Sequence, residues 1–217
     1  GITIGVAAIV ALTSVSEGMQ LQMTEWIKSS MGADLIVTST GSNEMLPEGR
    51  IPENYVNVIA GIRGVSSTSK QLYGIGLVEK ASCLIQGFEP DMKITHITIT
   101  SGSIFKENSL DEVIVGQKLS SCLGVELGDH VTVSSKSQSK KFRVVGVFQA
   151  TSLMMDESCM ISLKAAQELF QDPEKVSIVL VNLNNLEDTG SIKSEIERLL
   201  SGVSVVEQKQ VLDTVQR

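Results

Sequence analysis

Aromatic side chains and basic charge are both scarce in this chain of 217 residues. Phe, Trp and Tyr together make up 4% of the sequence, which disfavours a surface that binds bases or sugars by stacking. Asp and Glu number 25 against 18 Lys and Arg, and the net charge of −7 disfavours contact with phosphate backbones. No nucleic acid partner is therefore expected. A hydrophobic content of 42% excludes a disordered chain and suffices for a core.

Cysteine and histidine are also few. The cysteines are Cys83, Cys122 and Cys159, far apart and without a Cys-x-x-Cys pair. An odd number leaves at least one thiol free, which excludes a disulfide framework, and we expect all three to be small buried hydrophobic residues. The two histidines, His96 and His130, fall in different predicted strands and do not have the spacing of a metal-binding pair.

Motifs of catalysis and nucleotide binding are absent from the sequence. No G-x-x-x-x-G-K-[ST] loop or G-x-S-x-G elbow occurs. Gly74 and Gly76 could begin a dinucleotide fingerprint, but Glu79 stands where its third glycine belongs, so a strand with flexible glycines is predicted. We interpret the carboxylate pairs Asp111–Glu112 and Asp156–Glu157 as solvated edges, with weak cation binding as the alternative. No catalytic, cofactor-binding or metal-binding residue is predicted, and the chain is not expected to be an enzyme.

The first charged residue is Glu17, and the sixteen residues before it are uncharged. A helix of that length is slightly short of the ~20 residues of a membrane crossing. We interpret residues 1–16 as the outer part of a first transmembrane helix, with a buried soluble helix and a trimmed signal sequence as alternatives. From Glu17 to Val37 the only basic residue is Lys28, which indicates an extracytoplasmic flank. Residues 17–31 are predicted to continue as a stalk helix.

Beyond the stalk the chain alternates between two patterns. Residues 32–90 and 151–207 read as strand, helix and strand, and are predicted to form one discontinuous α/β subdomain. Residues 91–150 are predicted to form an inserted β-rich subdomain. Residues 208–217 are predicted to begin a second stalk helix towards a second transmembrane span. The predicted fold class is therefore α+β.

The predicted insert has a core of its own. Gly124 falls where the helix QKLSSCL should end, and Gly146 interrupts a strand as a β-bulge would. Period-two spacing within the flanking strands predicts a shared buried face. Its predicted members are Val113, Val115, Leu119, Leu123, Val131, Val133, Val145 and Val147.

Several of these segments together resemble the MacB/FtsX-type family of ABC transporter permeases. They are IGVAAIVALTSVSEGM…GADLIV, EVIVGQKLSSCLGVELGDHVTV, FRVVGVFQ and MISLKAAQELF. The resemblance is closest to the MacB-like periplasmic core domain, between the first and second transmembrane helices. It implies a porter-like α/β subdomain near the membrane with an inserted β-rich, Sabre-like subdomain.

The resemblance also implies a function and partners. The expected function is mechanotransmission, in which ATP hydrolysis in the cytoplasm moves this outer domain and drives cargo export. The implied partners are an ABC ATPase subunit or domain, a second permease copy, the cell membrane, and a peptide, lipid or lipoprotein cargo. Two alternatives stay open: an exported α/β hydrolase or solute-binding protein, and a membrane-anchored sensor or scaffold domain. Further spans after Arg217 would favour the permease.

Overall fold

The computed structural model describes residues 33–42, 49–90, 97–136, 138–150 and 152–207. The predicted transmembrane segment, both stalk helices and His96 lie outside these residues. Within them, no helix is both long and apolar enough to cross a membrane. The elements are, in chain order, β1 (Leu35–Ser39), β2 (Ile51–Pro52), α2 (Tyr55–Ala60), β3 (Val65–Val78), β4 (Ala81–Phe88), β5 (Ile97–Gly102), β6 (Glu112–Gly116), α3 (Gln117–Leu123), β7 (His130–Ser135), β8 (Gln138–Ala150), α4 (Leu153–Asp156), β9 (Cys159–Ser162), α5 (Leu163–Phe170), β10 (Lys175–Val176), β11 (Ile178–Leu183), the 3-10 helix η1 (Leu186–Asp188), α6 (Thr189–Leu199) and β12 (Val203–Glu207).

One mixed sheet connects most of these strands. Its order in the described part of the chain is β12-β1-β11-β3-β4-β9-β6-β8-β5, and β7 lies off this path, paired with both β3 and β8. The pairs β4–β9 and β6–β8 are parallel, and the other pairs are antiparallel. A mixed sheet with separate helices confirms the predicted α+β class.

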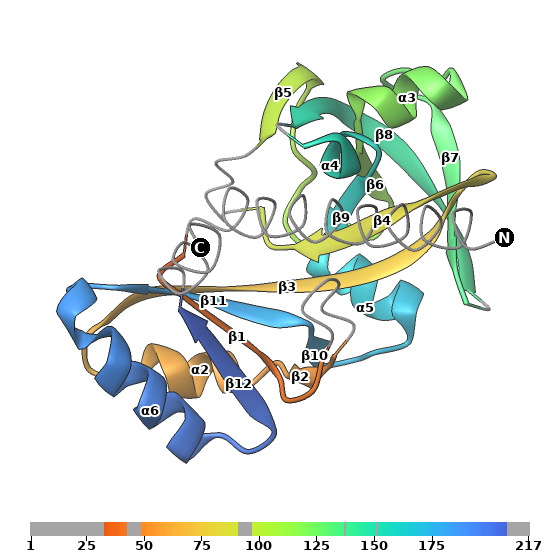
Figure 1. Ribbon diagram of the computed structural model, residues 1–217. Helices are drawn as coiled ribbons and strands as arrows, with labels where there is room; N and C mark the ends of the chain where they lie inside the picture. Colours follow the sequence, from red (N-terminus) through yellow and green to blue (C-terminus); the bar gives the residue numbers. More distant parts are fainter. Residues whose placement is uncertain (1–32, 43–48, 91–96, 137, 151, 208–217) are drawn as a thin grey trace, which may run out of the picture.

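The first region of the sheet consists of β12, β1, β11 and the first half of β3. Helices α2 and α6 cover one face of these strands (Figure 1). Alternation along the strands turns one set of side chains towards the helices. That buried set is Leu35, Val37, Val179 and Val181 from the strands, and Ile59, Ile192 and Ile196 from the helices. We call this part the helix-covered region.

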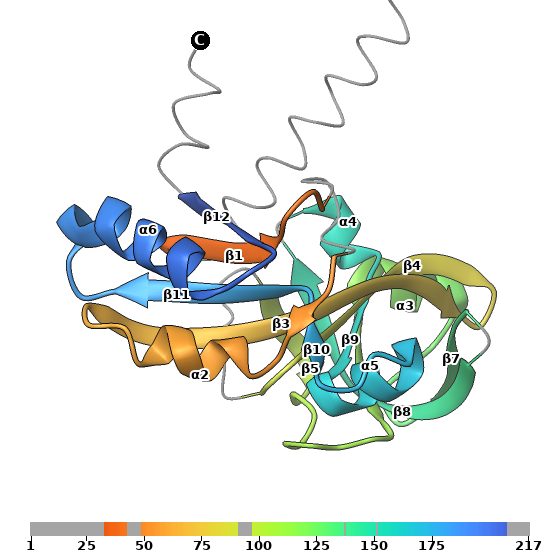
Figure 2. The same cartoon turned by 90° about the horizontal axis from the view of Figure 1, so that it is seen from below.

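The second region is a closed ring of strands. The second half of β3 pairs with β4, and the pairing continues through β9, β6, β8 and β7. Strand β7 then returns to β3, where Leu77 is opposite Ser134 and Val78 is opposite Val133. Helix α5 contacts β3, β4, β7, β8 and β9 of this ring. Figure 2 shows β3 running from the helix-covered region into the ring.

The ring takes strands from both sides of the subdomain boundaries proposed at residues 90 and 151. Strands β6, β7 and β8 fall within 91–150, whereas β3, β4 and β9 fall outside it. The pairing of β6 with β9 continues the sheet across the second boundary. The division into two subdomains stays a proposal, and backbone pairing joins its two parts.

Most of the residues predicted for the core of the insert are buried together. Val113, Val115, Leu119, Val131 and Val133 belong to one buried cluster, and Leu123 and Val147 pack against it. Gly124 ends α3 in the left-handed conformation with a φ of 65°, as predicted.

The prediction was wrong for Val145, because a β-bulge intervenes. Val144 is opposite Val113, but the next pair joins Ile114 to Gly146, so one extra residue of β8 interrupts the register. Val144 is consequently fully buried in the ring core, whereas Val145 packs against a second cluster on the other face. The polar segment SKSQSKK is largely strand, because β7 ends at Ser135 and β8 begins at Gln138.

We expect Val144→Asp to lower the free energy of unfolding by roughly 4 kcal/mol, because it would bury an unpaired carboxylate in the ring. The matched control is Val145→Asp, whose side chain is only partly buried and should cost clearly less. Urea denaturation of the two variants measures the difference. If Val145→Asp proves the more damaging variant, the assigned register of β8 is wrong.

Candidate functional site

The histidine and the carboxylates singled out in the sequence do not come together in one place. His130 is exposed at the beginning of β7. Within the described residues, no group of three or more His, Cys, Asp and Glu side chains could hold a metal ion. Asp156 accepts a hydrogen bond from the Ala150 N–H at 3.1 Å, and Glu157 pairs with Lys118 at 2.6 Å. These carboxylates have local structural partners.

Glu112 corrects the interpretation of the Asp111–Glu112 pair as a solvated edge. Its side chain is buried, and one carboxylate oxygen accepts the Lys106 N–H at 2.8 Å. The other oxygen pairs with Arg143 Nη2 at 3.1 Å. Glu112 therefore fixes the loop before β6 to strand β8.

Gly74 and Gly76 lie in β3, as the strand prediction required. A Cβ on Gly74 would lie 2.5 Å from the Phe170 ring, and one on Gly76 would lie 2.3 Å from the Ser134 carbonyl oxygen. Both distances are shorter than van der Waals contact. The close approach of α5 and β7 accounts for the glycines here.

The expectation that all three cysteines are buried holds for Cys83 and Cys159 and is wrong for Cys122. Cys122 lies near the end of α3, on the side that faces solvent.

The most elaborate polar network lies where the helix-covered region meets the ring. Its centre is Arg50, just before β2. Arg50 Nε donates to Asp172 at 2.7 Å, Nη1 donates to Ser177 Oγ at 3.0 Å, and Nη2 donates to the Tyr73 carbonyl oxygen at 3.1 Å. The guanidinium group also lies over the Phe170 ring, 5.9 Å from its centroid. Arg50 thereby joins β3, the end of α5 and the beginning of β11, and we call this network the junction.

The junction fills a gap along one edge of β3. Strand β11 pairs with β3 as far as Gln71, and β7 resumes the pairing on that edge at Leu77. Between them, the Tyr73 N–H donates to Ser177 Oγ at 3.0 Å, and the Tyr73 C=O accepts from Arg50. Ser135 Oγ donates to the Ile75 C=O at 3.1 Å. Side chains thus take the place of the missing strand for the Tyr73 N–H, the Tyr73 C=O and the Ile75 C=O as β3 passes from one region to the other.

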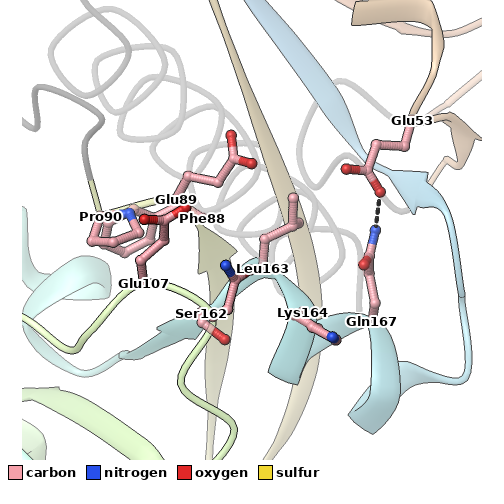
Figure 3. Close-up of a pocket in the computed structure, with 10 residues that line it drawn as sticks. Glu53, Phe88, Glu89, Pro90, Glu107, Ser162, Leu163, Lys164 and Gln167 are labelled. Atoms are coloured by element: carbon pink, nitrogen blue, oxygen red, sulfur yellow. Dashed lines mark hydrogen bonds between the residues drawn. The ribbon is translucent and has the colours of Figure 1, made fainter.

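A second set of polar contacts lies beside the junction and connects the segment after β2 to α5 and β3. Glu53 accepts a hydrogen bond from Gln167 of α5 at 2.6 Å (Figure 3). Glu53 also pairs with Lys70 of β3. Lys70 also pairs with Glu89, after β4, at 3.1 Å. Glu53, Glu89 and Gln167 border a cleft of about 190 Å³, whose other lining residues are Phe88, Pro90, Glu107, Asn108, Ser162, Leu163 and Lys164.

The charges of this bridge stabilise one another. Burial raises the pKa of Glu53, but the hydrogen bonds from Lys70 and Gln167 outweigh burial, so that the net pKa is lowered. Burial lowers the pKa of Lys70, but the hydrogen bonds to Glu53 and Glu89 outweigh it and raise the net pKa. Both groups are therefore held in their charged forms.

None of the junction residues was predicted from the sequence. Arg50 and Asp172 are 122 residues apart, and Glu53 and Gln167 are 114 apart. No spacing or motif relates them. The two-residue strands β2 and β10, which bring Arg50 near Ser177, are also too short to show a period.

We expect Arg50→Met to lower the free energy of unfolding by about 3 kcal/mol, because it leaves Asp172, Ser177 Oγ and the Tyr73 carbonyl without this donor. Arg50→Lys should recover only part of the loss, since an ammonium cannot reproduce the planar arrangement of donors. Urea denaturation measures both. Equal stability of Arg50→Met and the parent protein would show that the junction contributes nothing.

We expect Glu53→Gln to lower the free energy of unfolding by about 1 kcal/mol at neutral pH. A carboxyl group whose pKa is lowered on folding stabilises the fold above its unfolded pKa. The deficit of the variant should therefore shrink as the pH falls below 4.5. Thermal melts across that range measure it, and Glu89→Gln is the matched control because Glu89 shares Lys70 but is more exposed. A deficit that does not change with pH would contradict the assignment.

Comparison with known proteins identifies a family. The chain matches the family described as MacB-like periplasmic core domain over residues 1–199. It is 28% identical to a pyoverdine export ATP-binding/permease protein of Pseudomonas syringae pv. syringae, over 93% of this chain and 34% of that protein. It is 22% identical to an uncharacterized ABC transporter permease of Methanocaldococcus jannaschii, over 99% of this chain and 58% of that one. The chain thus spans about a third to somewhat more than half of these relatives.

Solved structures show the same fold. The periplasmic region of MacB from Actinobacillus actinomycetemcomitans matches with a TM-score of 0.63 and 13% identity, over 88% of this chain and 96% of that one. The extracellular domain of the noncanonic ABC-type transporter YknZ from Gram-positive bacteria matches with a TM-score of 0.62 and 17% identity, over 80% and 99%. At these identities the likeness establishes the fold alone. Together with the family match over most of its length, it shows that the chain belongs to the MacB-like periplasmic core domains, the extracytoplasmic domains of ABC transporter permeases.

Proposed function

We propose that this chain couples ATP hydrolysis in the cytoplasm to a conformational change on the outer side of the membrane, and so to cargo export. In this proposal the ATPase is a separate subunit or domain, since the sequence contains no phosphate-binding loop. A second permease copy and the cell membrane are the other proposed partners. The cargo is proposed to be a peptide, lipid or lipoprotein.

The observation that carries the proposal is the pairing of the first and last described strands. Leu35, at the beginning of β1, is directly opposite Glu207, at the end of β12. The point where the chain enters the described sheet and the point where it leaves are therefore adjacent, on neighbouring strands. A domain inserted between two consecutive membrane spans has to return to the surface that it left, and this pairing meets that requirement.

The junction supports the transmission of such a motion. A displacement applied at β1 and β12 passes through β11 to β3 by backbone hydrogen bonds. Strand β3 continues into the ring. The contacts of Arg50 with Asp172 and of Glu53 with Gln167 connect the segment around β2 to α5 at the place where β3 enters the ring. A continuous hydrogen-bonded path resists bending better than a flexible linker would, so a movement near the membrane can reach the ring.

The experiment places cysteines at positions 23 and 212 of the full-length protein, with Cys83, Cys122 and Cys159 replaced by alanine. We propose that residues 19–27 and 209–217 are paired stalk helices, with axes ~8–10 Å apart. A short bismaleimide should then link the two positions and lower ATP turnover severalfold, because relative stalk motion is blocked. ATP turnover is measured in membrane vesicles before and after crosslinking.

The matched control is a second cysteine pair at positions 38 and 204. Thr38 is opposite Ser204 in the β1–β12 ladder, so a crosslink there joins residues that are already held together. It should leave ATP turnover unchanged. Absence of a 23–212 crosslink would refute the paired stalk. A crosslink that forms without any effect on turnover would refute the coupling.

A further inference from the structure

Two cysteines lie side by side in the core of the ring. Cys83 is on β4 and Cys159 is on the neighbouring parallel strand β9, where Cys159 is opposite Ile85. Residues two apart on a strand point to the same face, so Cys83 and Cys159 share one side of the sheet. Both belong to the same buried cluster, with exposed fractions of 7% and 0%. Cys83 and Cys159 are far apart in the sequence, so no local spacing relates the two thiols.

The environments of the two sulfur atoms differ. The hydrogen bond from the Cys159 thiol lowers the pKa of Cys83, and burial raises it. Hydrogen bonds from the backbone N–H groups of Val78 and Cys159 also lower this pKa, and the net pKa of Cys83 is lowered. The hydrogen bond with Cys83 and complete burial both raise the pKa of Cys159. Cys83 is thus the thiol that ionises first, and it is also the one with some access to solvent. This is the arrangement of an attacking and a resolving thiol.

We propose that Cys83 and Cys159 form an oxidation site, in which a low-molecular-weight disulfide converts the two thiols into an intrachain disulfide between β4 and β9. The proposal rests on the proposed function for one point only, that an extracytoplasmic domain meets an oxidising compartment.

The reaction proceeds in two exchanges. The Cys83 thiolate attacks one sulfur of the small disulfide, forms a mixed disulfide and releases one thiolate. Cys159 then loses its proton and attacks the Cys83 sulfur, which releases the second small thiol and forms the Cys83–Cys159 bond. The two protein thiols lose two electrons and two protons in total, and the small disulfide gains them to become two thiols.

The strand geometry indicates that the bond is reversible. Hydrogen-bonded strands lie about 4.8 Å apart and rise about 3.3 Å per residue, so two Cα atoms that are two residues out of register lie roughly 8 Å apart, whereas a disulfide requires about 4.4–6.8 Å. Cys83 lies two residues before the first pair of the ladder, Ile85 and Cys159, and the backbone there has to move by more than about 1 Å. The bond therefore forms under strain and is readily reduced again. The oxidised ring should nevertheless melt at a higher temperature, because the bond closes a long loop of the unfolded chain.

The test uses purified full-length protein with oxidised glutathione as the probe. After incubation, free thiols are blocked with N-ethylmaleimide under denaturing conditions, and the digested protein is analysed by mass spectrometry. We expect a peptide pair joined through Cys83 and Cys159 and two hydrogens lighter than the reduced pair. Exposed Cys122 should carry glutathione, which shows within the same sample that the reagent was active. Reduced glutathione should restore both ring thiols.

Two variants separate the roles of the thiols. Cys159→Ala should retain glutathione on Cys83, because no resolving thiol remains, whereas Cys83→Ala should leave Cys159 unmodified. The proposal is overturned if the parent protein modifies Cys122 while both ring thiols remain free, or if Cys83 stops at the mixed disulfide with Cys159 present. Neither result depends on ATP turnover, so a failure here is distinct from a failure of the coupling proposal.

Discussion

The architecture depends on how the backbone hydrogen bonds along one edge of the long strand β3 are made. Strand β3 carries β11 on one edge at its beginning and β7 on the same edge at its end. Between these partners Tyr73 is buried, and each of its backbone groups left without a hydrogen bond would cost roughly 1–3 kcal/mol. Ser177 and Arg50 supply the bonds of Tyr73, and Ser135 supplies one for Ile75. This arrangement lets a single strand serve two differently shaped regions.

The same constraint explains why α5 lies where it does. Asp172 follows α5 closely and holds Arg50, while Phe170 of α5 lies under the guanidinium group and against Gly74. The helix also supplies Gln167 to Glu53. One short helix is thus fixed to the ring by packing and to the helix-covered region by polar contacts. The proposed coupling requires such a connection, because a flexible link would absorb the displacement.

The two buried thiols lie in the part of the ring that this connection reaches. Strand β4 pairs with β3 along its length, and β9 leads directly into α5. A covalent bond between β4 and β9 would therefore tighten the wall of the ring next to the junction. Under the two proposals, oxidation of these thiols would stiffen the ring beside the path that carries the movement.

Local sequence determined the elements, and the tertiary structure decided their partners. Period-two runs and glycine positions were enough to place β6, β7 and α3, with the end of α3 at Gly124, because these signals depend on near neighbours. They could not assign Val144 and Val145 to the correct faces, since the bulge in β8 is defined only against β6.

The burial of Glu112, the Arg50–Asp172 bridge and the contact of Cys83 with Cys159 follow from strand order. Strand order is set by packing between segments far apart in the chain. The charge balance and the missing motifs are properties of composition and local sequence, so the sequence alone led to the expectation of no nucleic acid partner and no catalytic site. Only the closed ring and the edge of β3 could create the junction.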